Sequence, residues 1–119
     1  MNTISKILVV AALAVAMLLG CAQPNPHPMD MSMAVQSAKT NTDHEALAAH
    51  YEQAARDAEA KVAEHKKLLE QYEAKSYLYG KQVGSFEEHC EALINSYGKV
   101  AAANAAMAKM HRQMAAGAK

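Results

Sequence analysis

Methionine and histidine recur near both ends of this chain in a pattern that suits metal binding. Thioether sulfur and imidazole nitrogen are donors that soft ions such as Cu(I) accept well. Met-x-Met spacing occurs near residue 30, and a second Met/His group lies near residue 110. The candidate ligands are His27, Met29, Met31, Met33, His44, His50, Met107, Met110, His111 and Met114. If the fold brings the two ends together, these residues predict a copper-binding site.

The same residues also fit a protein that binds no metal. Methionine fills irregular gaps in helical cores, and Met107, His111 and Met114 fall at helical spacing. The methionines near residue 30 also fit a polar tether. The sequence therefore leaves two functions open, a periplasmic Cu(I)-type binding protein and a structural protein that needs no cofactor.

Cys90 is the second residue type with possible chemistry. It follows His89 directly, so on a helix the two side chains point about 100° apart and form no chelate. A buried cysteine behaves as a small hydrophobic residue, and the alternative is an intermolecular disulfide through Cys90 in an oxidising compartment. The sequence contains no acid–base pair, nucleophile set or phosphate-binding loop, so we do not expect an enzyme.

Composition excludes one class of partner. The chain has 12 basic and 12 acidic residues, no tryptophan and one phenylalanine. Without a basic patch or interleaved aromatic residues, we expect no nucleic-acid binding.

The first segment of the chain lies directly before Cys21. After Lys6, an apolar run of about 13 residues leads to Gly20 and Cys21, which is the length of a signal-peptide core and too short to span a bilayer. The stretch Leu18-Leu19-Gly20-Cys21 resembles a bacterial lipobox.

The lipobox resemblance implies a location. Residues 1–20 are then a lipoprotein signal peptide, and the mature chain begins at Cys21 with acyl groups such as palmitate attached. Ala22 rather than Asp at the next position implies sorting to the outer membrane, with the chain facing the periplasm. Several acyl chains together make such an anchor stable.

Residues 21–41 are predicted to be the lipidated cysteine and a flexible tether. Pro24, Pro26 and Pro28 favour extended backbone, and the segment shows no helical or strand period.

Residues 42–119 are predicted to form two long helices. Thr42 and Glu45 form a capping-box pattern, which opens a helix that runs from about residue 43 to residues 76–79. Gly80 and Gly84 then predict a turn, with Gly80 in the left-handed conformation. Ser85 begins a second capping-box pattern for the following helix.

The second helix has a regular heptad pattern. Asn104 is the polar residue expected to set the register, and Gly98 is expected to allow close approach of another backbone. The predicted seam consists of Phe86, Cys90, Leu93, Tyr97, Val100, Asn104, Met107, His111 and Met114, flanked by Ile94, Ala101, Ala105 and Ala108.

The predicted fold is all-α, an antiparallel two-helix hairpin of the coiled-coil kind. A short turn makes the helices neighbours. Because a two-helix core is thin, we expect oligomerisation to complete a four-helix bundle. The predicted partners are therefore the membrane, through the lipid anchor, and either a second copy or another envelope protein. The expected cross-helix pairs are Ser76 with Phe86, Tyr72 with Cys90, His65 with Tyr97, and Tyr51 with His111.

One further resemblance covers most of residues 43–116. The segment from Lys75 to Gln82, the pair His89-Cys90 and the pair His111-Arg112 resemble short, all-helical proteobacterial lipoproteins. The resemblance supports the class of protein and implies no activity. The predicted function is that of a membrane-anchored lipoprotein that presents a helical hairpin to a partner.

Lipidation can be tested at one atom. Replacing Cys21 with Ser removes the thiol that carries the acyl group, so incorporation of a clickable fatty acid in a bacterial host should be abolished. The parent chain labelled in parallel is the control, and continued labelling of the Cys21→Ser chain would refute the lipoprotein prediction.

Overall fold

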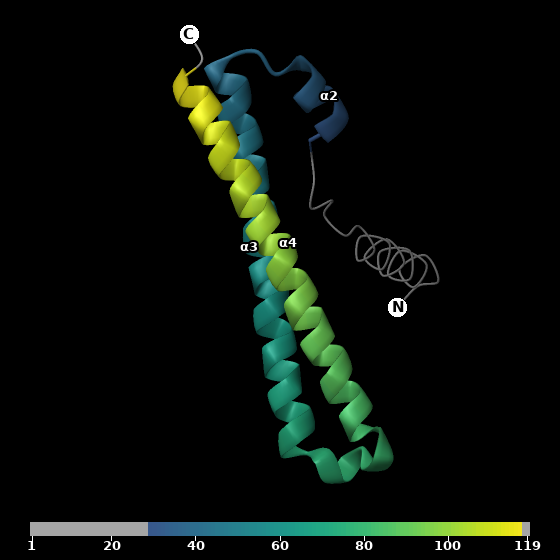
Figure 1. The fold of residues 1–119 in the computed structure, drawn as a ribbon. Coiled ribbons are helices and arrows are strands. Elements are labelled where there is room, and N and C mark those ends of the chain that lie inside the picture. The colour runs from purple at the N-terminus through teal and green to yellow at the C-terminus, as the bar shows by residue number, and fades with distance from the viewer. Residues whose placement is uncertain (1–28, 118–119) are drawn as a thin grey trace, which may run out of the picture.

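The structure, a computed structural model, describes residues 29–117 and is helical over most of that range. Figure 1 shows two long helices side by side, with a turn segment at one end and the start of one helix beside the end of the other at the opposite end. We call this opposite end the open end. The elements are α2 (Met31–Ser37), α3 (Asn41–Ala74), the 3-10 turns η2 (Ser76–Leu78) and η3 (Gly80–Gln82), and α4 (Val83–Gly117). The all-helical prediction is confirmed, since residues 29–117 contain no strand.

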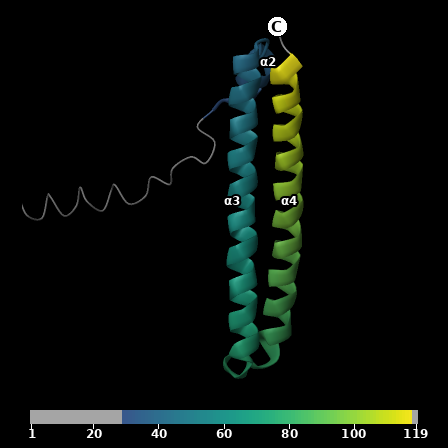
Figure 2. The same cartoon turned by 90° about the vertical axis from the view of Figure 1, so that its left-hand side faces the viewer.

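The short helix α2 corrects the prediction of a structureless tether. The Asp30 carboxylate accepts a hydrogen bond from the backbone N–H of Met33 at 3.1 Å, and the Ser37 hydroxyl donates to the Met33 carbonyl at 2.8 Å. Seven residues are too few for a helical period to be visible in the sequence. α2 lies beside the start of α3 (Figures 1 and 2). Residues 21–28 lie outside the described part of the chain.

The start of α3 lies slightly earlier than predicted. The cap is Thr40 instead of Thr42, and its hydroxyl accepts from the N–H of Asp43 at 3.1 Å. The Asp43 carboxylate accepts in return from the N–H groups of Lys39 at 3.0 Å and Thr40 at 2.9 Å. These bonds lower the pKa of Asp43 below its usual value of 3.8. Thr40 and Asp43 also have the capping-box pattern, two residues before the predicted pair. The capping hydrogen bonds form at Thr40 and Asp43.

The connection between α3 and α4 is longer than predicted. α3 ends at Ala74 and two 3-10 turns follow. Gly80 has φ +53°, as expected for the residue that reverses the chain. The predicted second cap is wrong, because Ser85 lies inside α4, which begins directly after η3.

The buried seam between α3 and α4 consists mainly of alanine. Leu47 is the largest side chain that is fully buried, at 1 % exposed. The other buried apolar residues are Ala48, Ala55 and Ala58 of α3, and Cys90, Ala101, Ala108 and Ala115 of α4. Small side chains on both helices permit close packing of the two backbones.

The face of α4 that is buried differs from the face that the heptad pattern predicts. Ala101, Ala108 and Ala115 are buried, whereas Val100 is 47 % and Met114 51 % exposed. The predicted seam is therefore wrong at its larger aliphatic positions. Two of the alanines that were expected to flank it, Ala101 and Ala108, lie at its centre, whereas Ala105 is exposed. Alanine takes this place because a larger side chain there would force the backbones apart.

Within residues 29–117, Asn104 and Gly98 make no close contact with α3 of the kind predicted for them, and their roles toward a second chain stay predictions. The Asn104 side-chain amide donates to the Val100 carbonyl of its own helix at 2.9 Å, so it forms no bond across the seam. No atom lies within 4 Å of a Cβ placed on Gly98, so no other part of residues 29–117 approaches closely there.

Aromatic and imidazole rings line one side of the seam. Tyr51 stacks on His111 with centroids 5.5 Å apart, and His65 stacks on Tyr97 at 5.7 Å, which confirms two predicted pairs.

The two predicted pairs nearest the turn are wrong, because Tyr72 stacks on Phe86 at 4.8 Å. The connection lies earlier in the chain than the predicted turn at Gly80 and Gly84. Phe86 consequently faces a residue earlier in α3 than Ser76.

Alanine at two glycines near the turn, Gly80 and Gly84, should change the stability of the fold in opposite directions. Gly80→Ala should destabilise the fold by about 1 kcal/mol, because L-residues disfavour the left-handed region. Gly84→Ala should stabilise it by up to about 1 kcal/mol, because Gly84 is helical and no atom lies within 4 Å of an added Cβ. Urea unfolding measures both changes, and shifts of the same sign would contradict the assigned conformations.

Candidate functional site

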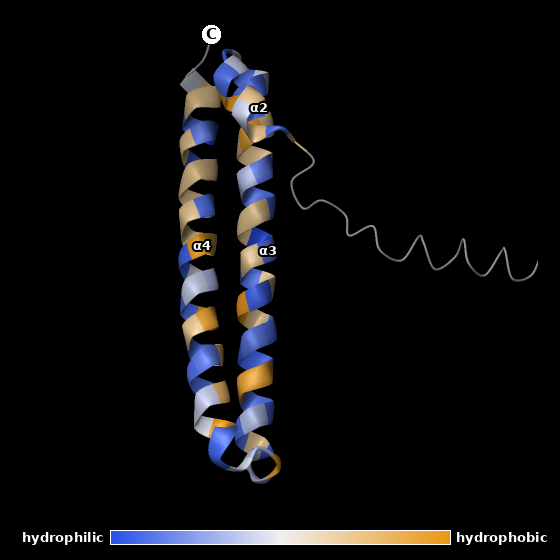
Figure 3. Ribbon diagram, turned by 90° about the vertical axis from the view of Figure 1, so that its right-hand side faces the viewer, coloured by the Kyte–Doolittle hydropathy of each residue, from blue (hydrophilic) through white to orange (hydrophobic). Residues whose placement is uncertain are grey.

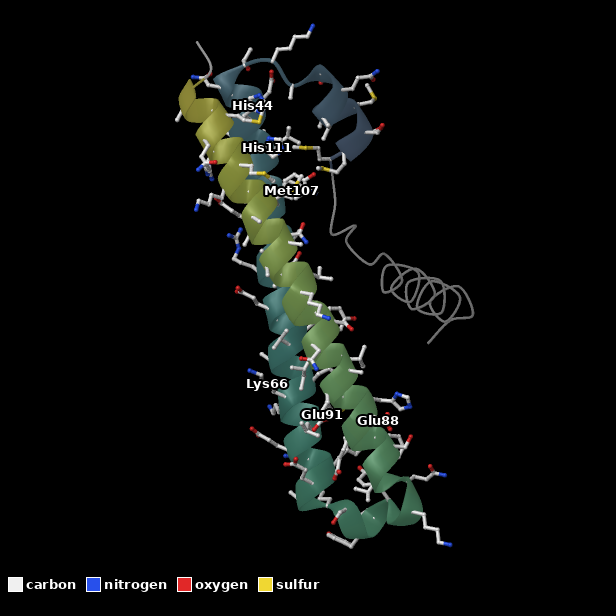
Figure 4. The ribbon with its side chains drawn as sticks, in the orientation of Figure 1. His44, Lys66, Glu88, Glu91, Met107 and His111 are labelled. Atoms are coloured by element: carbon white, nitrogen blue, oxygen red, sulfur yellow. The ribbon has the colours of Figure 1, made fainter. Side chains whose placement is uncertain are left out.

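Two histidines meet at the open end. His44 is in the first turns of α3 and is 8 % exposed, and His111 is near the end of α4. Their Nδ1 atoms lie 3.2 Å apart, and the ring centroids are 5.4 Å apart with planes 25° from parallel, so the rings meet at their Nδ1 edges. A hydrogen bond at this distance has one Nδ1 as donor and the other as acceptor. Figure 4 labels both residues at the open end.

The His111 ring contacts two rings of α3. It meets His44 at the Nδ1 edge and stacks on Tyr51, whose plane is 7° from parallel with its own. The two α3 residues are seven apart in sequence, so their rings project from the same face of α3. Burial, and to a lesser extent the charge of His44, lower the pKa of His111 below its usual value of 6.5. The arrangement favours neutral imidazole at neutral pH.

Arg112 joins the same two helices next to the histidines. Its guanidinium donates to both carboxylate oxygens of Glu52, each at 3.0 Å, and it also pairs with Glu45. The two glutamates are seven residues apart, like the two rings that contact His111. Sequence reasoning missed this arrangement, although Glu45 and Glu52 repeat the His44 and Tyr51 spacing one residue later.

The structure brings together only part of the predicted metal set. His44 and His111 are in contact, and Met107 lies one turn before His111 on α4 (Figure 4). Met33, Met110 and Met114 are 66 %, 48 % and 51 % exposed.

Three of the remaining predicted ligands, His50, Met29 and Met31, lie within the described residues. The His50 ring contacts Tyr51, and Met29 lines a hollow between α2 and α3. Met31 is the first residue of α2. His27 lies outside the described residues.

No group of three or more His, Cys, Asp or Glu side chains within residues 29–117 could hold a metal ion.

Of the two cysteines, only Cys90 lies within the described residues. Cys90 is a free thiol and is 5 % exposed, so a disulfide to a second chain requires the seam to open first. Cys21 lies outside the described residues, and its lipidation stays a prediction. Within residues 29–117, no helix has both the length and the hydropathy needed to cross a bilayer.

An exposed apolar stripe follows α4 beside the seam. We call it the α4 stripe, and its members are spaced by seven residues. Four of them are between 38 % and 51 % exposed, and Figure 3 shows apolar segments repeated along α3 and α4. The α4 stripe consists of Phe86, Leu93, Val100, Met107 and Met114.

A shallow groove opens beside the middle of the α4 stripe. Its volume is about 400 Å³, and Ala58, Tyr97, Val100 and Asn104 are among its lining residues. On α3 the heptad positions of His44, Tyr51, His65 and Tyr72 carry rings, and Ala58 is the one position between them that does not. Because Ala58 carries no ring, the space at this heptad position stays open as the groove.

The histidine pair predicts a pH dependence of stability. Unfolded His111 takes up a proton near pH 6.5, whereas the folded state resists protonation. The free energy of unfolding should therefore fall as the pH drops from about 7.5 to 5. Urea unfolding at several pH values measures the slope, which should be smaller in His111→Gln and unchanged in His89→Gln. Equal slopes in the parent and His111→Gln would contradict the prediction.

Three comparisons with known proteins return no match: none with a protein-family model, none with a curated protein and none with a solved structure.

Proposed function

We propose that this chain is a lipid-anchored periplasmic protein whose two long helices form an antiparallel hairpin that pairs with a second copy. The resulting four-helix bundle is its working form, and its role is structural rather than catalytic. The exposed α4 stripe carries the proposal, because it runs the length of a helix and four of its five members are between 38 % and 51 % exposed. The lipid anchor rests on the lipobox at Cys21.

The thin core supports association. Within residues 29–117 only one large side chain, Leu47, is fully buried, and alanine contributes little apolar area. Small helical proteins with so little buried surface commonly need oligomerisation to be stable. The larger apolar side chains of α4 instead lie on the surface, where a second copy can cover them.

The area of the face is adequate for a stable dimer. A helix of 35 residues is about 50 Å long, and two helices packed 8–10 Å apart make a face roughly 18 Å wide. Such a face buries on the order of 900 Å² per copy, within the range of specific interfaces. The groove beside Val100 gives an apolar side chain of the second copy a place to pack.

Charge also suits a second copy. Between Ala92 and Ala108, Lys99 is the only charged residue of α4, so pairing the two stripes buries few charges. Without Lys6 the mature chain has 12 − 1 = 11 basic residues and 12 acidic ones, a formal net charge of about −1, so two copies repel each other only weakly at long range. On α3, Asp57 and Lys61 line the groove with opposite signs.

The proposed anchor orients the assembly. The chain reaches the open end first after Cys21, so the open end lies toward the outer membrane and the turn at Gly80 points into the periplasm. In this arrangement the turn is the part of the bundle most accessible to other envelope proteins.

Sedimentation of the mature chain, residues 21–119, with Cys21→Ser tests the association. We expect a dimer, and Val100→Glu should weaken it by at least about 100-fold, because an unpaired carboxylate in an apolar interface costs several kcal/mol. Asn95→Glu introduces the same charge at an exposed position of α4 outside the stripe and should leave the dimer intact. A stable, cooperatively unfolding monomer would refute the proposal.

A further inference from the structure

The contact between His44 and His111 has the dimensions of a metal site. Two imidazole nitrogens that bind one ion, each at about 2.0 Å, lie roughly 3.2–3.5 Å apart. The two Nδ1 atoms are 3.2 Å apart and come from different helices. An ion can therefore replace the shared hydrogen with little movement of either backbone.

The surrounding donors select the kind of ion. Glu45 and Glu52 are the carboxylates beside the histidines, and both are bonded to Arg112. Within the described residues no third His, Cys, Asp or Glu completes the pair. The site therefore offers too few ligands to Zn(II) and to other ions that need three or four nitrogen, oxygen or thiolate ligands.

Methionine sulfur is the donor that remains. Met107 lies one turn before His111 on α4 and Met114 one turn after it, so both share its side of the helix. Figure 4 shows the labelled Met107 adjoining His111. Thioether together with imidazole suits Cu(I), a soft ion that accepts low coordination numbers.

We propose that Nδ1 of His44, Nδ1 of His111 and a thioether of Met107 or Met114 bind one Cu(I) ion. The ion links the start of α3 to the end of α4. Binding is a function additional to assembly, because every proposed ligand belongs to a single copy.

The test uses the mature chain, residues 21–119, with Cys21→Ser and Cys90→Ala, which removes both thiols as competing Cu(I) ligands. Anaerobic titration with Cu(I) against a chromogenic chelator should give one equivalent bound with a Kd below about 1 μM. His44→Gln or His111→Gln should weaken binding by at least about 100-fold. His89→Gln removes a histidine far from the open end and should change nothing. Equal affinity in the parent and His111→Gln would overturn the proposal.

Methionine variants test the thioether without endangering the fold, since leucine has nearly the same volume. The double variant Met107→Leu with Met114→Leu should lose at least about tenfold in Cu(I) affinity, whereas Met33→Leu should lose none. With Ag(I) as a redox-stable probe, the methyl NMR signal of Met107 or Met114 should shift and that of Met33 should not. Unchanged affinity in the double variant, or tighter binding of Zn(II) than of Cu(I), would overturn the proposal.

Discussion

Close packing of α3 on α4 through alanine is the constraint on which the rest of the structure depends. Ala48 and Ala55 on one helix and Ala101 and Ala108 on the other occupy the centre of the seam. Small side chains let the backbones approach, so larger residues can lie only beside the seam. The rings on one side, the α4 stripe and the histidine contact all follow from this exclusion.

Rings at heptad spacing on α3 close one side of the seam. Tyr72 lies against Phe86, His65 against Tyr97, and Tyr51 against His111. Ring stacking of this kind adds apolar contact that the alanines cannot supply. At His65 the stabilisation from stacking is partly offset. Its Nδ1 is buried and has no hydrogen-bond partner within the described residues, which lowers the free energy of unfolding.

The open end differs from the middle of the pair in its chemistry. His44, Glu45 and Glu52 of α3 meet His111 and Arg112 of α4 through polar contacts. The middle offers an apolar face and a groove instead. The two proposals therefore concern different parts of the molecule, with assembly along the α4 stripe and ion binding at the open end. Met107 and Met114 belong to both sets, so a bound ion would fix side chains that also lie in the proposed interface.

Local patterns in the sequence determined the helical class, the turn and much of the register. Gly80, the apolar spacing and the pairs Tyr51 with His111 and His65 with Tyr97 were all predictable, because helix periodicity and glycine conformation are local properties. The caps were less predictable. Thr40 with Asp43 and Thr42 with Glu45 are both acceptable capping patterns, and only the hydrogen bonds that form distinguish them.

Tertiary packing alone decided which face of α4 is buried. By hydrophobicity Leu93, Val100 and Met114 belong in a core, but the distance between the backbones favours alanine there, and that distance is a property of the pair. For the same reason the sequence supplied ten candidate ligands, whereas the structure brings His44 and His111 to 3.2 Å. Residue type identifies a possible donor, but the rotation of each helix about its own axis determines which donors meet.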